Sequence, residues 1–250
     1  MNLKEEIIEF IERKVSESEH NDFYRRPLIG FSSAEDPLYY QLKEIVGPQH
    51  THPKDYLENA KTVVSFFIPF SDKIVSSNRK DKVPSPEWAE SYIVTNKLIS
   101  DICSSLVEYL ESKGINATTI KVTRNYDEKT LKADWSHRSA AYIAGLGTFG
   151  VNRMLITPMG CAGRYGSVIM SYEVEPDTRP EEEYCLYFKN GKCLVCVKAC
   201  PVQALEADDF DRFKCEARLK ENSELLTDYG KCTVCGKCVV SCPRAIIKSK

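Results

Sequence analysis

The sequence predicts an α+β region over residues 1–178, followed by a small cysteine-rich domain over residues 179–250. Helix-like and strand-like segments alternate in the first part, but without the regular strand–helix–strand order of a parallel sheet. Nine of the 11 cysteines lie between Cys185 and Cys242. Between the two parts, residues 175–184 are acidic and contain proline, as is typical of a linker.

The composition is that of an ordinary globular protein. Of 250 residues, 42% are hydrophobic and 28% are charged, which is enough apolar material for a core. The formal net charge of -2 gives no electrostatic reason to expect a nucleic acid or an anionic membrane as partner. No apolar run approaches the roughly 20 residues that cross a bilayer, and the charged N-terminus is unlike a secretory signal. We therefore expect a cytoplasmic protein without a membrane partner.

The first third of the chain contains two expected helices and one expected strand. Residues 3–15 carry aliphatic side chains on one helical stripe. Residues 21–60 are interrupted by prolines and are expected to be irregular, except for a short helix over residues 37–45. The β-branched and aromatic run at residues 62–68 predicts a buried strand. The polar residues 71–84 that follow it predict a surface loop.

A long helix is expected after this loop. Ser85 can cap its first turn, while Pro86 and Glu87 suit the positive end of the helix dipole. Apolar residues then recur every four positions, at Leu98, Ile102, Leu106 and Leu110. Gly114 is a good helix terminator.

Four shorter elements are expected before the cysteine-rich domain. A strand is expected over residues 117–122 and a short helix over residues 136–144. Two more strands are expected over residues 154–157 and 167–174.

The last cysteine motif is complete. Cys232, Cys235, Cys238 and Cys242 with Pro243 form the pattern C-x2-C-x2-C-x3-C-P. Three thiolates on such a loop hold three irons of a [4Fe–4S] cluster, and the fourth cysteine ligates the other cluster of a pair. A zinc site would instead favour paired C-x2-C knuckles without the third cysteine and the proline. Because cytosolic thiols stay reduced, disulfides are the weaker alternative.

The preceding motif lacks its first cysteine. Cys193, Cys196 and Cys200 match its last three positions, but Asn190 stands where the first cysteine belongs. Cys185 lies five residues upstream of Asn190 and is the natural substitute. The chain is therefore expected to hold two [4Fe–4S] clusters, as bacterial ferredoxins do.

The ferredoxin pattern assigns the ligands to two sets. One cluster would use Cys185, Cys193, Cys196 and Cys242. The other would use Cys200, Cys232, Cys235 and Cys238, with Cys215 left as a ninth candidate. Of the two remaining cysteines, Cys103 is expected in the core, and Cys161 has a structural role or a role in a site as alternatives.

The segment from Asp134 to Ser167 carries an unusual combination of glycines and polar residues. Gly145, Gly147 and Gly150 either let a ligand approach the backbone or simply let the chain turn. The glycines do not follow a clear strand, so they are not a dinucleotide-binding fingerprint. Ionisable and polar residues bracket them: Asp134, His137, Arg138, Asn152, Arg153 and Arg164. Together they predict a pocket for a polar, anionic cofactor or substrate.

This segment, followed by two cysteine motifs, resembles the epoxyqueuosine reductase family and, more distantly, the reductive dehalogenases. The matching signature is Arg138, the pattern AxxAGLGxxGxN from Ala141 to Asn152, an aliphatic strand, and the pair Gly166 and Ser167. The match covers roughly half of the chain. The residues before it match only in general plan.

The resemblance implies a nitroreductase-like α/β N-terminal domain that binds a corrinoid, with two clusters feeding electrons to its cobalt. By this resemblance, the residues around the glycines are the cofactor-binding candidates: Arg138, Gly145, Gly147, Gly150, Asn152, Arg153 and Arg164. The family's catalytic aspartate, thought to protonate the substrate, has Asp134 as its nearest equivalent here. His137 is the second candidate, and for both residues a helix-capping or structural role is the alternative.

Two departures from the family bear on these expectations. The family places a cluster ligand at a position like that of Cys215, so Cys215 and Cys232 compete for one place; the resemblance favours Cys215 and the loop spacing favours Cys232. Longer members also carry helical repeats after the clusters that help to bind tRNA, whereas this sequence ends at Lys250. With the net charge of -2, this argues against tRNA as the substrate.

The function expected from the sequence is low-potential reduction. Electrons from a donor such as a ferredoxin or flavodoxin would pass through the clusters to a corrinoid near Asp134–Arg164, for reduction of a small molecule. The alternative is a non-enzymatic electron-transfer protein, or a reductive activator of a corrinoid protein or another redox partner. A flavin in the N-terminal domain is the weaker cofactor alternative.

Overall fold

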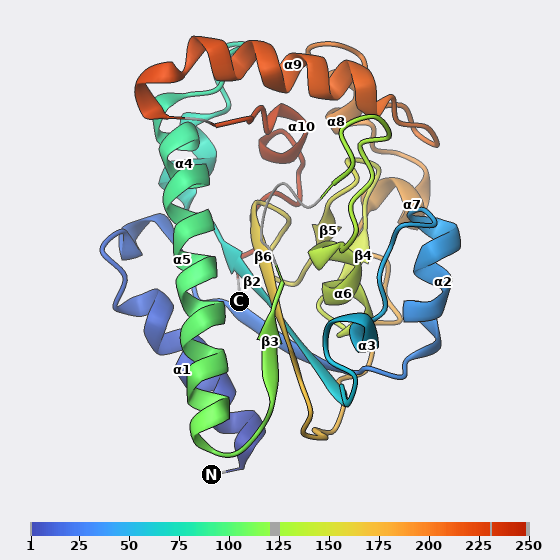
Figure 1. Cartoon of the computed structure of the whole chain (residues 1–250). Coiled ribbons are helices and arrows are strands. Elements are labelled where there is room, and N and C mark those ends of the chain that lie inside the picture. Colours follow the sequence, from blue (N-terminus) through green and yellow to red (C-terminus); the bar gives the residue numbers. More distant parts are fainter. Residues whose placement is uncertain (1, 121–125, 231, 249–250) are drawn as a thin grey trace.

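The fold is built on an antiparallel sheet, in a computed structural model that describes residues 2–120, 126–230 and 232–248 (Figure 1). The strand order is β1-β2-β6-β3, with every neighbouring pair antiparallel. These strands are β1 (Leu28–Ser33), β2 (Thr62–Pro69), β6 (Gly163–Met170) and β3 (Ala117–Thr119). A separate two-stranded ribbon joins β4 (Thr148–Phe149) to β5 (Leu155–Ile156).

Strand β2 lies inside the sheet and is buried along its whole length. Val64, Phe66 and Ile68 belong to the large core that includes helices α1 and α5. Val63 and Phe67 belong to the smaller clusters on the side of helix α6. Because helices cover both faces, the strand is buried on both sides and mostly apolar, with Thr62 and Ser65 as its polar residues.

Helices α1 (Leu3–Ser16) and α5 (Pro86–Ser112) cover one face of the sheet. Asn2 and Glu5 form a reciprocal capping box at the start of α1. The Ser85 side chain accepts a hydrogen bond from the backbone N–H of Trp88 and so caps α5, as expected. Gly114 follows the end of α5 with a φ of 77°, so both predicted ends of the long helix are confirmed.

The other face carries α2 (Pro37–Ile45), α3 (Pro53–Tyr56) and α6 (His137–Ile143). Trp135 is almost fully buried there, stacked at 5.9 Å between ring centroids on Tyr39. Its indole Nε1 donates to the Ser167 hydroxyl of β6 at 3.1 Å. The expected helices at residues 37–45 and 136–144 are confirmed.

The described part of the cysteine-rich segment contains four α-helices and a short 3-10 helix at Thr227–Tyr229. The α-helices are α7 (Leu186–Asn190), α8 (Val195–Lys198), α9 (Arg212–Leu225) and α10 (Lys237–Val240). Helix α9 crosses the top of the view in Figure 1, above α10. After α10 the chain returns to the sheet, where Cys161 and Ala162 donate backbone hydrogen bonds to Arg244 and Ala245. Apolar residues of both parts therefore share one core.

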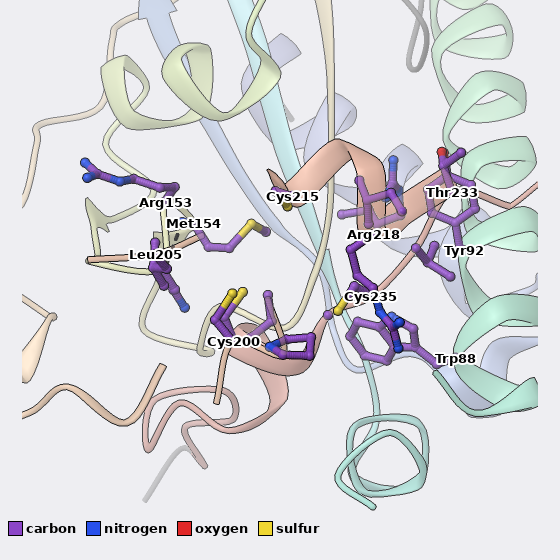
Figure 2. A pocket seen from close by; sticks show the side chains of 18 of the residues that line it. Trp88, Tyr92, Arg153, Met154, Cys200, Leu205, Cys215, Arg218, Thr233 and Cys235 are labelled. Atoms are coloured by element: carbon purple, nitrogen blue, oxygen red, sulfur yellow. Dashed lines mark hydrogen bonds between the residues drawn. The ribbon is translucent and has the colours of Figure 1, made fainter. Parts of the chain in front are cut away.

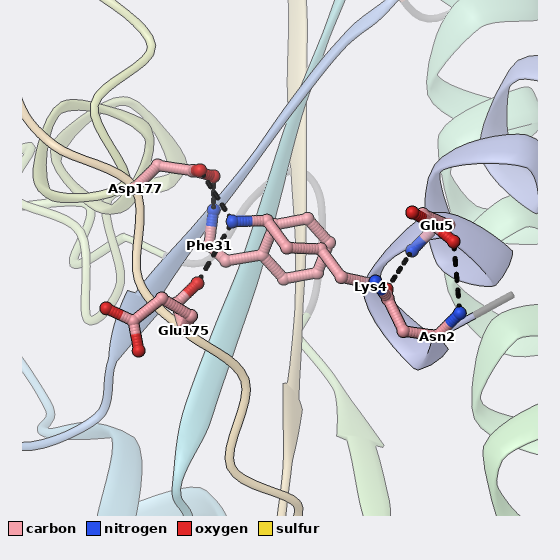
Figure 3. A network of polar contacts seen from close by, with 6 residues as sticks. All are labelled: Asn2, Lys4, Glu5, Phe31, Glu175 and Asp177. Carbon is pink, nitrogen blue, oxygen red and sulfur yellow. Dashed lines mark hydrogen bonds and ion pairs between the residues drawn. The ribbon is translucent and has the colours of Figure 1, made fainter.

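The segment that resembles a linker has no regular structure, but it is attached to the sheet. The Asp177 carboxylate accepts from the Lys4 ammonium at 2.6 Å and from the Phe31 backbone N–H at 2.9 Å (Figure 3). Lys4 also donates to the Glu175 carbonyl at 3.0 Å. Helix α1 and strand β1 thus hold the start of this segment in place.

Several sequence-based expectations were wrong or incomplete. Residues 71–84 contain helix α4 (Asp72–Ser77), whose buried Ile74 and Val75 form too short an apolar pattern to be recognised. Strand β1 and helix α3 lie within the region expected to be irregular. Strand β6 begins at Gly163 and ends at Met170, whereas residues 167–174 were expected. The expected strand at 117–122 is present as far as Thr119, and its last two residues lie outside the described residues.

None of the helices in the described ranges combines the length and the apolar run that crossing a bilayer requires.

Candidate iron–sulfur sites and the adjoining cavity

The structure gathers eight of the nine C-terminal cysteines into two sets. The first set lines a small cavity beneath Val151 and Asn152 and consists of Cys185, Cys193, Cys196 and Cys242. The second set lines a larger cavity, called here the central cavity, and consists of Cys200, Cys215, Cys235 and Cys238.

The two sets exchange members in the manner of a two-cluster ferredoxin. Cys196 belongs to the first set, yet Cys200 at the end of the same short helix belongs to the second. In the same way, Cys238 faces the second set and Cys242 the first. A helix after each cysteine loop carries its last cysteine away to the other set, as the spacing predicts.

Cys215, and not Cys232, lies with the second set. Helix α9 brings Cys215 to the wall of the central cavity, where Figure 2 shows it with Cys200 and Cys235. Cys232 is fully buried elsewhere, with its sulfur 4.0 Å from the Leu226 carbonyl oxygen. The geometry therefore agrees with the family resemblance and not with the loop spacing.

The electrostatics of both sets favour bound cations. Burial and, to a smaller extent, the neighbouring cysteines raise the pKa of Cys196 and of Cys215 to about 11. Four thiolates side by side in such a site are stable only if a positive charge offsets them, and iron supplies that charge.

A single zinc ion and a [4Fe–4S] cluster place different demands on a set of four thiolates. Across residues 2–120, 126–230 and 232–248, no three His, Cys, Asp or Glu side chains converge on one metal position. A zinc site would place four ligands at about 2.0–2.3 Å from one ion. In a [4Fe–4S] cluster each thiolate binds a different iron, so the sulfurs surround a larger volume.

The central cavity has a volume of about 370 Å³ and lies between the sheet region and the cysteine-rich region (Figure 2). Helix α5 contributes Trp88, Ser91 and Tyr92 to its wall. The segment between α6 and β6 contributes Asn152, Arg153 and Met154, and α6 and β6 themselves contribute Arg138 and Arg164. The second cysteine set forms another part of the wall.

Four of the predicted cofactor-binding residues therefore meet at one cavity: Arg138, Asn152, Arg153 and Arg164. The Arg138 guanidinium donates to the backbone carbonyl of Arg153 and to the Met154 sulfur. The Asn152 side chain accepts from the Met154 backbone N–H at 3.2 Å and donates to the Cys161 sulfur at 3.5 Å. These contacts hold the loop between α6 and β5 against the cavity.

The three predicted glycines pack against the chain itself, and none of them lines the central cavity. A Cβ atom on Gly147 would lie 2.1 Å from the Ile156 carbonyl oxygen, so only glycine fits beside β5. Gly145 has a φ of 77°, and a Cβ there would lie 2.5 Å from the Thr178 carbonyl oxygen. A Cβ on Gly150 would meet the Ile156 side chain at 2.8 Å.

The two catalytic candidates also lie apart from the cavity wall. The Asp134 side chain is exposed, while its backbone carbonyl accepts hydrogen bonds from the Thr51 backbone and hydroxyl. His137 is buried, with its Nδ1 2.6 Å from the Ser167 hydroxyl. The family resemblance and their closeness to Arg138 in the chain brought them into the predicted site.

The sequence analysis did not identify several residues that line the central cavity. Trp88, Ser91 and Tyr92 lie at i, i+3 and i+4 on α5, so they share one helix face, but this looks like ordinary packing. Arg218 on α9 also lines the cavity. An aromatic and polar face near the start of α5 was the only available indication.

Positive charge dominates the polar part of the cavity wall. The Arg164 guanidinium lies 4.5 Å from the centre of the Tyr92 ring. Desolvation lowers the pKa of Arg164, and the charge of the nearby Arg138 lowers it further. Both groups remain charged at neutral pH, because an arginine pKa normally lies above about 12.

Comparison with known protein families gives a match at the C-terminal end. The model of a 4Fe-4S binding domain matches residues 226–248. This range contains Cys232, Cys235, Cys238 and Cys242.

Among curated proteins, the chain is similar to epoxyqueuosine reductases. It is 25% identical to the enzyme of Staphylococcus aureus over 208 residues, covering 78% of this chain and 50% of the relative. It is also 25% identical to the enzyme of Bacillus anthracis over 244 residues, covering 86% of this chain and 60% of the relative. The chain thus spans about half to three fifths of the length of these relatives.

Solved structures show the same fold. The epoxyqueuosine reductase of Streptococcus thermophilus superposes with a TM-score of 0.59 at 21% identity, covering 98% of this chain and 66% of that chain. The catabolic reductive dehalogenase NpRdhA superposes with a TM-score of 0.58 at 17% identity, covering 86% of this chain and 29% of that chain. By sequence and by fold, this chain resembles the epoxyqueuosine reductases and carries a 4Fe-4S binding domain near its C-terminus.

Proposed function

We propose that the chain is an iron–sulfur oxidoreductase that delivers electrons from two [4Fe–4S] clusters to an acceptor in the central cavity. One observation carries this proposal: the second cysteine set lines the same cavity as Arg138, Asn152, Arg153 and Arg164. A cluster held there would face the acceptor directly. The similar curated proteins are named as reductases, which supports the reaction class.

The first and second cysteine sets are the proposed cluster ligands, as defined above. When bound, such clusters supply one-electron transfers at potentials set by hydrogen bonds and solvent exposure. The protein contributes the burial: Cys196, in the first set, is 7% exposed, and apolar residues such as Val239 shield the second set. Burial keeps water away from the sulfurs and so tunes the potential.

The acceptor that we propose is a corrinoid. The structure of a reductive dehalogenase of similar fold is described as suggesting a mechanism for B12-dependent dehalogenation. The central cavity suits such a cofactor in kind, because it combines arginine and asparagine donors with the apolar side chains of Trp88, Tyr92 and Met154. Its volume of about 370 Å³ matches only a part of a corrinoid, so the remainder would lie outside the cavity. A bound corrinoid would supply a cobalt centre for low-potential reduction.

The proposed cofactor residues act by binding and orientation. Arg138 and Arg164 would donate hydrogen bonds to polar groups at the cavity wall, and Tyr92 would hold the Arg164 guanidinium in position. The glycines Gly145, Gly147 and Gly150 would act indirectly, by shaping the loop. We also propose that the N-terminal region is nitroreductase-like and that a domain boundary follows residue 178.

Asp134 remains the proposed proton donor, with His137 second. A solved Bacillus subtilis epoxyqueuosine reductase of similar fold is described with its catalytic aspartate loop swung out of the active site. An exposed Asp134 outside the cavity is compatible with a loop of this kind. The acid would then deliver its proton only when the loop closes on a bound substrate.

The two candidate substrates are a small molecule and tRNA. One epoxyqueuosine reductase has been solved with a tRNA stem loop that carries epoxyqueuosine. The net charge of -2 therefore does not exclude tRNA, because a relative with the same fold binds it. A ferredoxin or flavodoxin remains the proposed electron donor.

The proposal can be tested with anaerobically purified protein whose clusters have been reconstituted. We expect cob(II)alamin to remain bound after desalting and to give an EPR signal of protein-bound cobalt that disappears on reduction. Intact cluster signals without any retained cobalamin would contradict the corrinoid proposal and favour the electron-transfer alternative. Retention of a flavin instead would identify a different acceptor.

A further inference from the structure

The central cavity contains an unusual excess of positive charge. Four arginines line it: Arg138, Arg153, Arg164 and Arg218. No aspartate or glutamate is among its described lining residues. Because a concave site has a lower dielectric than water, like charges repel each other strongly there unless an anion lies between them.

Two of the four arginines lie near groups that can offset their positive charge. Arg218 pairs with Glu221 at 3.2 Å and donates to the Lys82 carbonyl at 3.1 Å. Arg138 lines the same cavity as Cys215 and Cys238 of the second set, and its guanidinium donates to the Arg153 carbonyl. A cluster on this set, with its thiolates, would carry a net negative charge that these two arginines offset.

The other two arginines are left without a negative partner. Within the described part of the chain, neither Arg153 nor Arg164 forms an ion pair. The Nε atom of each is buried and has no hydrogen-bond acceptor among the described residues. Arg164 is nevertheless held in a fixed position, over the Tyr92 ring and close enough to Arg138 to be repelled by it.

We propose that the ligand of the central cavity carries an anionic group, a phosphate or a carboxylate, and that Arg164 binds it. A guanidinium has a planar set of donors that matches two oxygens of either group, and an unpartnered Nε is part of that set. This inference rests on the proposed function, since it places the anion at the proposed acceptor site. It narrows the ligand class to molecules with at least one such group.

The first test uses inorganic pyrophosphate as the probe and the cluster-loaded protein as the receptor. Isothermal titration calorimetry should detect saturable binding to one site per chain. Arg164→Gln should weaken the affinity about tenfold or more, as expected when a hydrogen bond to a charged group is lost. The control is Arg26→Gln, because Arg26 is exposed, pairs with Glu12 and lies outside the cavity. This control should bind as the wild type does.

The pyrophosphate experiment tests the anion site independently of cobalamin binding, which tests the proposed function. Absorbance and EPR of the clusters should be the same in all three proteins, which shows that the variants are folded and loaded. Absence of saturable pyrophosphate binding, or equal affinity for Arg164→Gln and the wild type, would overturn the inference even if cobalamin binds. Pyrophosphate binding that depends on Arg164 would support it even if cobalamin does not bind.

A second arm identifies the source of the anion. Cobinamide lacks the nucleotide-loop phosphate of cobalamin, so their affinities can be compared on the wild type and on Arg164→Gln. If the substitution weakens only cobalamin, the anion is the phosphate of the cofactor itself. If it weakens neither corrinoid but still weakens pyrophosphate, the anion belongs to a separate phosphorylated or carboxylated substrate. Both results support an anion site at Arg164.

Discussion

At the scale of single residues, the position of Cys215 decides which cysteines can hold the second cluster. Helix α9 places it in the wall of the central cavity with Cys200, Cys235 and Cys238. Cys232 belongs to the matched 4Fe-4S motif, yet it lies outside both cavities and is fully buried. We therefore propose Cys215, and not Cys232, as the fourth ligand of the second set.

Replacing Cys215 should remove one cluster. The wild type should contain about eight irons per chain, as two [4Fe–4S] clusters require. We expect Cys215→Ser to lose about half of this iron and the signal of one cluster. Cys232→Ser is the matched control and should keep nearly all of the iron, measured after anaerobic reconstitution. The reverse result would make Cys232 the ligand and would contradict the arrangement described above.

Cys161 is a second residue whose role comes from its neighbours. It is fully buried, accepts a hydrogen bond from the Asn152 side chain, and has its thiol pKa raised by the neighbouring Cys242 of the first set and by burial. A hydrogen bond to a cluster sulfur stabilises the reduced state, because that state places more negative charge on the sulfur.

Cys161→Ala should therefore lower the reduction potential of one cluster without reducing the iron content. The measurement is a redox titration followed by EPR, in which the two clusters give separate reduction steps. Cys103→Ala is a suitable control, because Cys103 is also buried but donates to the Ser167 carbonyl, away from both sets. Loss of iron in Cys161→Ala would instead make Cys161 a ligand, and unchanged potentials would deny it any influence.

At the scale of elements, the glycines in the loop between α6 and β5 allow this loop to pack closely against the rest of the chain. Gly147 faces the backbone of β5 so closely that any side chain would displace the strand. The loop carries Asn152 and Arg153 into the cavity wall, so its exact path positions two of the proposed cofactor residues. Its effect on ligand binding is thus indirect.

Gly147→Val should destabilise the whole fold. The added side chain overlaps the Ile156 carbonyl, and overpacking of this kind typically costs about 1–3 kcal/mol. For a chain of this size, each kcal/mol lowers the melting temperature by about 2–4 °C. Thermal unfolding followed by circular dichroism measures the change. An unchanged melting temperature with lost cobalamin binding would show that the glycine contacts the ligand directly.

At the scale of the whole molecule, the two predicted domains share a core. Apolar residues from α1 and α5 belong to the same buried cluster as Leu205, Val239 and Ala245. The Arg25 guanidinium, in the N-terminal part, donates to the carbonyls of Phe70, Met159 and Ile247. The central cavity exists only because both parts contribute to its wall.

A fragment consisting of residues 1–178 should therefore be less stable than the full chain. Removing residues 179–250 would expose part of this core, and apolar surface contributes about 25 cal/mol per Å² when it is buried. We expect a lower melting temperature and a broader transition, measured by circular dichroism with both proteins free of iron. A fragment that unfolds as cooperatively and at the same temperature as the full chain would support two independent domains.

The sequence by itself determined the features that depend on local patterns. Caps and periodicity predicted α1, α2, α5 and α6, because side chains such as Ser85 act on backbone groups only a few residues away. The cysteine spacing and the similarity around Arg138 to Asn152 indicated an iron–sulfur protein of this kind, which the comparisons support. Four polar residues predicted for the pocket do line one cavity.

Only the tertiary structure decided which distant residues meet. Strand β1 was missed because Gly30 weakens its local pattern, yet it pairs with β2, and glycine is needed there because a Cβ would lie 2.4 Å from the Ala144 carbonyl. The choice of Cys215 depends on how α9 crosses the cysteine-rich region, and the excess charge of the cavity depends on Arg164 and Arg218 reaching it from separate elements. Packing between residues far apart in the sequence fixes such positions, and local sequence preferences cannot predict that packing.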